Sequence, residues 1–252
     1  MSTASRPRHT DDPGEPDAPE TGGGAGQAAA PDEGPSASAL AGLDIAGFRA
    51  LAAARLERFP RLAVPDAPGM RRAAVVLCVL PAADGTLAVL VIKRAYRGRN
   101  AGQWGLPGGR METGETAEQA ALRELHEELA LPADPDDILG VLDDFPATSG
   151  FAITPVVVTM PSADGLRPHP DEVHSVHHVS LTRLAAPDVP HWLRRDDFPD
   201  GPDLLQMRLG PKMTIHAPTG AMLWQFREAV LLEATPEQAR VAHFAQPEWT
   251  RR

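Results

Sequence analysis

The feature that most constrains this chain is a predicted helix, residues 116–129, with three glutamates on one face. Glu124, Glu127 and Glu128 stand at positions i, i+3 and i+4, and residues at that spacing are neighbours on a helix surface. Three carboxylates gathered in this way repel one another, so the face is either solvated or neutralised by a cation. Sites rich in anionic oxygen suit Mg²⁺ or Mn²⁺, which also bridge to the phosphates of a substrate.

The residues around this helix favour a bound cation over a solvated acidic face. Arg123 precedes the first glutamate, and Glu115 lies near the start of the helix, where a negative charge meets the helix dipole favourably. The loop Leu106-Pro107-Gly108-Gly109 contains two glycines, which allow the backbone to approach the helix and an ion closely. We therefore expect a divalent-metal site on this helix.

This segment resembles the Nudix box, a long motif of fixed spacing. The matching positions are Gly109, Glu115, Arg123, Glu124, Leu125, Glu127, Glu128 and Leu131. One position departs from the motif, because Ala130 stands where the family has glycine. The family glycine follows the helix, where a left-handed turn favours it, so alanine would cost about 1 kcal/mol if its φ is positive.

The resemblance implies a fold, a reaction and a set of ligands. The implied fold is α+β, a Nudix-type α/β/α sandwich with a mixed β-sheet. The implied reaction is hydrolysis of a nucleoside diphosphate linked to another moiety, by attack of water on phosphorus. The metal ligands would be Glu124, Glu127 and Glu128, together with the carbonyl of Gly108. The general base varies in the family, and the candidates here are Glu127, Glu124 and Glu172, the last of which also fits a solvated loop carboxylate.

A basic segment precedes the box and bears on the substrate. Lys93, Arg94, Arg97 and Arg99 lie close together in an otherwise acidic chain, and arginine binds phosphate oxygens well. The segment resembles the signature of the coenzyme A pyrophosphatase branch at Leu90, Arg94, Ala95, Arg99, Gly102 and Pro107-Gly108-Gly109. It departs at Ile92 and Leu106, and the spacing from Arg99 to Gly102 is one residue short. A solvated strand end is the alternative for the basic cluster.

We therefore expect Lys93, Arg94 and Arg99 to bind the substrate. The expected substrate is coenzyme A or an acyl derivative, cleaved to 3′,5′-ADP and 4′-phosphopantetheine or its acyl form. The alternatives are ADP-ribose, a dinucleotide or a damaged nucleoside triphosphate, and a non-catalytic module that binds a nucleotide. Loss of box glutamates would mark such a module, and all three are present.

The remaining pattern predicts interspersed strands and helices without a regular βαβ repeat, which favours a mixed sheet. Apolar spacing predicts a helix over residues 43–62 with Asp44 as N-cap and Pro60 as stop. Strands are expected over Ala73–Leu80, Leu87–Ile92, Ile138–Phe145, Phe151–Met160 and Val173–Leu181, the first two as a hairpin. Residues 187–210 are expected to be rich in loops, and helices are expected over Pro218–Leu232 and Pro236–Phe244.

Composition sets the domain limits and the expected partners. Residues 1–38 are rich in Pro, Gly, Ala and acidic residues, and we expect a disordered tail before a single domain over 39–252, which ends in a helical extension. The net charge of −10 argues against general binding of nucleic acid or anionic membrane. A single cysteine, Cys78, excludes a disulfide within the chain, so we expect a cytoplasmic protein. The resemblance to the family implies a small nucleotide substrate as its partner. A homodimer is also considered.

Overall fold

Strand β1 (Arg71–Pro81) forms the centre of a mixed sheet because both of its faces are apolar. It pairs in parallel with β7 (Phe151–Thr159) and antiparallel with β2 (Leu87–Arg94) and β4 (Gly108–Arg110). The other strands of this sheet are β3 (Trp104–Gly105), β5 (Ile138–Val141), β6 (Phe145–Pro146) and β8 (Val173–Ser180). The mixed sheet and the hairpin of β1 and β2 confirm the sequence prediction.

The computed structural model describes residues 37–96, 101–194 and 201–247, which all belong to one unit of the chain, Glu33–Arg252. Residues 1–36 of the predicted tail and Arg99 lie outside the described residues. Helix α1 (Ala37–Ala41) begins inside the region predicted as the tail, and its Leu40 is buried in the core.

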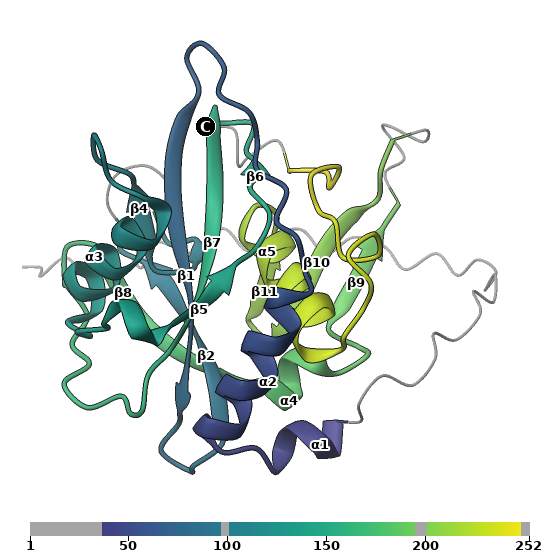
Figure 1. Ribbon diagram of the computed structural model, residues 1–252. Coiled ribbons are helices and arrows are strands. Elements are labelled where there is room, and N and C mark those ends of the chain that lie inside the picture. Colours follow the sequence, from purple (N-terminus) through teal and green to yellow (C-terminus); the bar gives the residue numbers. More distant parts are fainter. Residues whose placement is uncertain (1–36, 97–100, 195–200, 248–252) are drawn as a thin grey trace, which may run out of the picture. The chain divides into compact units, whose positions relative to one another are not determined.

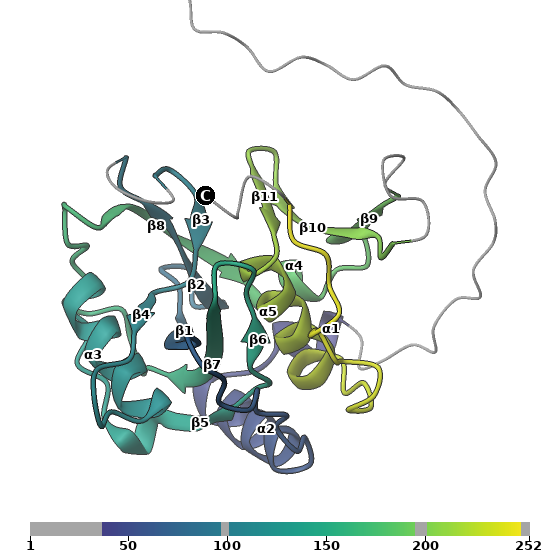
Figure 2. The same ribbon diagram turned by 90° about the horizontal axis from the view of Figure 1, so that it is seen from above.

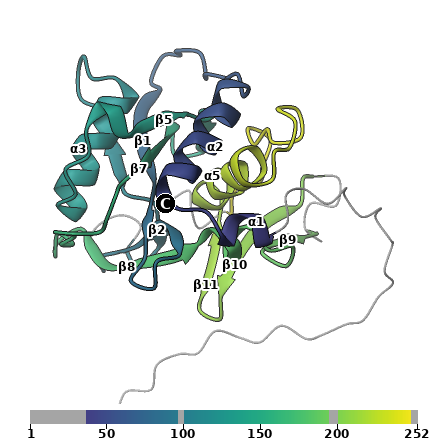
Figure 3. The ribbon, with the colours of Figure 1, turned by 60° about the horizontal axis from the view of Figure 1, so that its bottom comes forward.

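Helices cover both faces of the sheet (Figure 1). Helix α3 (Ala117–Leu129) lies on one face, and α2 (Ile45–Glu57) and α5 (Thr219–Phe226) lie on the other (Figures 2 and 3). Successive side chains of β1 face two different hydrophobic cores. Val76 packs in the core under α3, and Leu77 packs in the core on the opposite face of the sheet. Short helical segments complete the chain: η1 (Pro135–Asp137), α4 (Leu181–Ala185) and the π-helical η2 (Arg227–Leu231). The α/β/α sandwich is therefore confirmed.

Two predictions for the C-terminal third were wrong. The segment 187–210 contains β9 (Pro190–Leu193) and β10 (Leu204–Gly210), which form a second sheet with β11 (Met213–His216). Strand β10 buries alternate residues against α5 and the core, a pattern that the surrounding Pro and Asp residues concealed. The segment 236–244 forms turns instead of a helix, because its apolar residues Ala239, Val241 and Phe244 reach the core without helical backbone.

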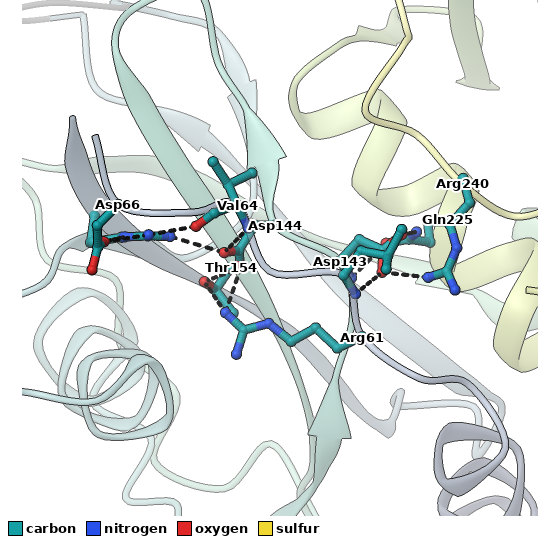
Figure 4. A network of polar contacts seen from close by, with 10 residues as sticks. Arg61, Val64, Asp66, Asp143, Asp144, Thr154, Gln225 and Arg240 are labelled. Carbon is teal, nitrogen blue, oxygen red and sulfur yellow. Dashed lines mark hydrogen bonds and ion pairs between the residues drawn. The ribbon is translucent and has the colours of Figure 1, made fainter. Parts of the chain in front are cut away.

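The strand predicted over Ile138–Phe145 is also interrupted. It divides into β5 and β6, because Asp143 and Asp144 leave the strand pairing and enter a buried polar network (Figure 4). Asp144 is fully buried and accepts hydrogen bonds from Arg61 at 2.6 Å and from Arg72 at 3.0 Å. It also accepts bonds from Thr154 and the Val64 amide.

Asp143 extends the same network to the C-terminal segment. Its carboxylate accepts hydrogen bonds from the Leu62 amide, from Gln225 Nε2 at 2.9 Å and from Arg240 at 2.6 Å. Arg240 also lies over the ring of Phe59 and bonds to the Pro60 carbonyl. The adjacent aspartates therefore connect the segment before β1, strand β7, helix α5 and the C-terminal turns.

Replacing the buried carboxylate of this network should be far more costly than replacing an exposed one. We expect Asp144→Asn to lower the free energy of unfolding by about 3 kcal/mol, because two arginines lose their common anionic partner. Asp66→Asn is the matched control, since Asp66 also pairs with Arg72 but is 95% exposed; it should change stability by less than about 1 kcal/mol. Urea denaturation measures both values, and equal effects would contradict the argument.

Helix α3 begins and ends with defined caps. Thr116 and Gln119 form a reciprocal capping box, in which each side chain accepts a hydrogen bond from the backbone amide of the other residue. At the other end, Ala130 adopts the left-handed conformation, with φ of 55° and ψ of 27°. The sequence departure at Ala130 therefore falls on a position that favours glycine.

Restoring glycine at this position should stabilise the protein. We expect Ala130→Gly to raise the free energy of unfolding by about 0.5 to 1 kcal/mol, because relief of the left-handed strain exceeds the larger entropy of an unfolded glycine. The measurement is the melting temperature by circular dichroism. Ala133→Gly provides a comparison at a nearby alanine without positive φ, and it should be neutral or destabilising.

Candidate active site

Two glycines of β4 bring the backbone of the sheet against helix α3. A Cβ atom at Gly108, where φ is 149°, would lie 2.4 Å from the Ala74 carbonyl oxygen. A Cβ atom at Gly109 would lie 2.2 Å from the Oε1 atom of Glu124. Gly108 therefore allows β4 to lie against the backbone of β1, and Gly109 allows the Glu124 carboxylate to lie against β4.

Arg123 organises the acidic residues at the start of the site. Its guanidinium donates two hydrogen bonds to Glu115, at 2.8 and 3.0 Å, and one to the Arg110 carbonyl. The same guanidinium bonds to Glu124 at 2.8 Å and to Glu127 at 3.0 Å. The Arg123 hydrogen bonds lower the pKa of Glu115, so that carboxylate stays ionised as a structural partner. The Arg–Glu brace implied by the resemblance is present.

Glu128 lies deeper than the other two glutamates. Its side chain is 1% exposed, whereas that of Glu127 is 54% exposed. The Oε2 atom of Glu128 accepts a hydrogen bond from the Gly108 amide at 3.0 Å, and its Oε1 atom lies 4.0 Å from Arg94. Burial raises the pKa of Glu128 to about 7, although Arg94 and the Gly108 amide oppose the shift. Burial also raises the pKa of Glu124.

The loop before β8, which contains Glu172, packs against the end of helix α3. The amides of Arg167 and His169 bond to the carbonyls of Leu129 and Glu128, which are otherwise unpaired at the end of α3. Glu172 follows in this loop, and its carbonyl accepts a hydrogen bond from the Ala95 amide. Its carboxylate is close enough to Glu124 and Glu128 to raise the pKa of both. Glu172 is therefore electrostatically coupled to the predicted ligands, although burial contributes most to both shifts.

The donor chemistry of these residues fits a hard divalent cation. Glu128 is a buried carboxylate with incomplete compensation, as its raised pKa indicates, and a cation would supply the missing positive charge. In the part of the chain that the structure describes, no three acidic, His or Cys side chains already form a metal-ligand group. Arg123 contacts two of the candidate ligands, Glu124 and Glu127. Metal binding would exchange Arg123 contacts for metal contacts at these carboxylates.

A cavity of about 300 Å³ adjoins the glycines. Gly108, Gly109 and Arg94 line its inner end, so Arg94 lies between the cavity and Glu128. The rest of the wall comes from residues that the sequence analysis did not assign to the site. They include Gln103, Ser149, Phe151, Thr219, Met222 and Gln246. They come from separate elements that only the fold brings together.

The remaining predicted residues are placed as follows. The ammonium of Lys93 lies over the rings of Tyr96 and Trp104, at 5.6 and 5.3 Å from their centroids. Trp104 also packs edge-on against His177. Lys93 therefore stabilises the rings of Tyr96 and Trp104. Among the contacts of the described residues, none joins Lys93 to Glu128. Arg99 is outside the described residues.

Comparisons with known proteins were made for the whole chain. The sequence model described as NUDIX domain matches residues 70–198, just over half of the chain. An uncharacterized Nudix hydrolase, NudL, of Pectobacterium atrosepticum is 35% identical over 117 residues, which is 46% of this chain and 60% of that protein. NudL of Escherichia coli K12 is 33% identical over 114 residues, 45% of this chain and 59% of that protein. The chain thus spans about three fifths of the length of these relatives.

One solved structure with a similar fold is the Nudix hydrolase RenU from M. smegmatis. It is 29% identical, with a TM-score of 0.37 over 46% of this chain and 74% of that chain. Among the described residues, no helix has the length and apolar character that a bilayer span requires.

The raised pKa of Glu128 leads to a pH-dependent stability. The folded pKa of about 7 exceeds the ordinary value of 4.5, so ionisation of Glu128 destabilises the metal-free fold. This cost is fully present above pH 7 and disappears below about pH 4.5. Glu128→Gln should therefore stabilise the metal-free protein by up to about 3 kcal/mol at pH 8, and the gain should shrink towards zero at pH 5. Urea denaturation in EDTA measures it, with Glu118→Gln as a control. A loss of stability at pH 8 would contradict the assignment.

Proposed function

The chain belongs to the Nudix family, and on that premise we propose that it hydrolyses the pyrophosphate bond of a nucleoside diphosphate conjugate, with coenzyme A or an acyl-coenzyme A as the substrate. The products would be 3′,5′-ADP and 4′-phosphopantetheine or its acyl form. The observation that carries the reaction class is the position of Arg94, between the buried Glu128 and the 300 Å³ cavity. A pyrophosphate at this point would meet the acidic helix face on one side, and a conjugated group would enter the cavity on the other.

The burial and the contacts of each acidic residue indicate its role in metal binding. Glu124 and Glu128 would hold the cation, because both are largely buried and both contact the glycine strand. The Gly108 carbonyl is the further ligand that the family resemblance implies. When bound, Mg²⁺ or Mn²⁺ lowers the pKa of a water molecule and neutralises charge on the pyrophosphate. Glu127 would complete the metal set after Arg123 releases it.

The proton of the attacking water needs an acceptor near the metal ligands. Glu172 supports this role best, because its carboxylate interacts electrostatically with Glu124 and Glu128 and is 49% exposed, so water can reach it. The backbone bonds of its loop to the end of α3 fix its position. Glu127 and Glu124 are the other candidates. Glu124 is less suited, because Arg123 already occupies one of its oxygens.

Arg94 would neutralise the substrate pyrophosphate. A guanidinium donates paired hydrogen bonds to phosphate oxygens, and each charge-assisted contact contributes about 1.5 to 3 kcal/mol. Its present neighbour, Glu128 at 4.0 Å, would turn to the cation once a substrate is bound. Arg99 remains a candidate for the 3′-phosphate that distinguishes coenzyme A from simpler ADP conjugates.

Replacing the proposed metal ligands should abolish turnover without unfolding the protein. We expect Glu124→Gln and Glu128→Gln each to lower kcat by at least about a thousandfold, which corresponds to about 4 kcal/mol. Glu118→Gln, on the same helix but outside the acidic cluster, should retain nearly full activity. Turnover is measured in Mg²⁺ and in Mn²⁺, with circular dichroism to check the fold. Near wild-type rates for both glutamine variants would refute the assigned site.

The substrate assignment has its own measurement, a comparison of kcat/KM for coenzyme A, ADP-ribose, a dinucleotide and nucleoside triphosphates. Coenzyme A should be cleaved most efficiently, with product chromatography identifying the broken bond. Cleavage of ADP-ribose or a nucleoside triphosphate at least tenfold more efficiently than coenzyme A would refute the substrate and leave the reaction class intact. A protein that binds nucleotides and cleaves none would instead be a binding module.

A further inference from the structure

The cavity beside the metal face continues into a second one. This second cavity has a volume of about 230 Å³. It shares four lining residues with the first cavity: Gln103, Trp104, Pro218 and Thr219. Gly108 and Gly109 line the first cavity and not the second, so the second lies farther from the acidic helix. The two cavities therefore adjoin at these residues, and we call them together the groove, with an inner lobe near the metal face and an outer lobe.

The wall of the outer lobe is made largely by a part of the chain outside the family match. Strand β11 and the start of α5 supply residues 214–219, whereas the family match ends at residue 198. Strand β3 supplies the facing wall, and its Trp104 is held in place by Lys93 and His177. The wall from β11 is therefore a feature in which this chain can differ from other family members.

The outer lobe has an uncharged and hydrogen-bonding lining. None of the described residues around it is an Asp, Glu, Lys or Arg. Burial lowers the pKa of His216, so its imidazole is neutral at pH 7. Within the described residues, the side chains of Gln103 and Thr219 have no hydrogen-bond partner. The described lining thus offers a phosphate group no counter-charge, while an uncharged group with amide or hydroxyl functions would find partners.

The size of the inner lobe limits what can fill the groove. About 300 Å³ is at the lower end of the range for ligand cavities, so a short group such as a single sugar needs no more space. A group that also occupies the outer lobe must be longer. The inner lobe ends at Arg94 and the glycines, where the pyrophosphate would lie, so the long group would be attached directly to it.

The geometry points to the outer lobe as the binding site for the far end of a long, uncharged, amide-bearing arm attached to the pyrophosphate. This inference rests on the proposed function and adds the basis of its selectivity. Conjugates with such an arm gain contacts with Gln103, Thr214 and Thr219. With a short-arm conjugate bound, the outer lobe remains filled with water. The wall from β11 thereby selects among nucleoside diphosphate conjugates.

The test is to fill the outer lobe. Thr214 is exposed in β11 and lines the lobe, so Thr214→Trp should be tolerated by the fold. We expect this variant to raise KM for coenzyme A, which has a long amide-bearing arm, by at least about tenfold with kcat within about twofold. The KM for ADP-ribose, which has a short arm, should change by less than about twofold. Lys212→Trp, in the same hairpin but outside the groove, should change neither value.

A second variant tests the same lobe without adding a larger side chain. Gln103→Leu retains approximate size but removes the amide, and it should raise KM for coenzyme A by about threefold or more. If coenzyme A is the best substrate and neither variant changes its KM, this inference is wrong and the proposed function stands. If the wild-type protein prefers ADP-ribose or a nucleoside triphosphate at least tenfold, both the substrate assignment and this inference are wrong. Melting temperatures confirm that all three variants are folded.

Discussion

The close approach of β4 to helix α3 is the constraint on which the candidate site depends. Gly108 lies against the backbone of β1 on one side, and Gly109 lies against the carboxylate of Glu124 on the other. A methyl group at Gly108 would clash with the backbone of β1, and one at Gly109 would displace the Glu124 carboxylate. The amide of Gly108 also supplies the one hydrogen bond that the buried carboxylate of Glu128 accepts from the strand. The two glycines thus set both the geometry and the electrostatics of the site.

A second level of organisation comes from Arg123. One guanidinium holds the loop before the helix through Glu115 and also holds two of the carboxylates that would bind metal. The acidic cluster is therefore stable in the absence of a cation, because one positive charge is shared among three negative ones. Glu128 is outside this arrangement, and burial raises its pKa to about 7. Among the proposed metal ligands, Glu128 is therefore the one whose ionisation destabilises the metal-free fold most.

Much of this arrangement could be predicted from the sequence, because it is local. The N-cap at Asp44, the hairpin of β1 and β2, and the limits of α3 follow from residue spacing and capping preferences. The left-handed Ala130 follows from the same local reasoning. The fixed spacing of the box also placed Arg123 beside Glu115, since residues on one helix and its preceding loop have few alternative positions.

The features that escaped prediction depend on contacts between distant parts of the chain. Asp143 and Asp144 interrupt a predicted strand because their partners lie up to 97 residues away, at Arg240. Strands β9 and β10 are short, and tertiary packing against α5 decides their conformation. The groove wall has the same origin, because β3, β11 and the start of α5 contribute to it without any shared motif.

The aspartate network also has a consequence for the order in which the chain can fold during synthesis. Strands β1, β2 and β7 and helix α3 precede residue 160, so the ribosome releases the acidic face early. Asp143 cannot meet Gln225 and Arg240 until the last part of the chain has emerged, and the wall at residues 214–219 is also late. A nascent chain would therefore hold the acidic face before the groove exists, and buried Asp143 would remain hydrated until then. The vectorial nature of translation thus delays the formation of the groove wall until residues 214–219 have been synthesised.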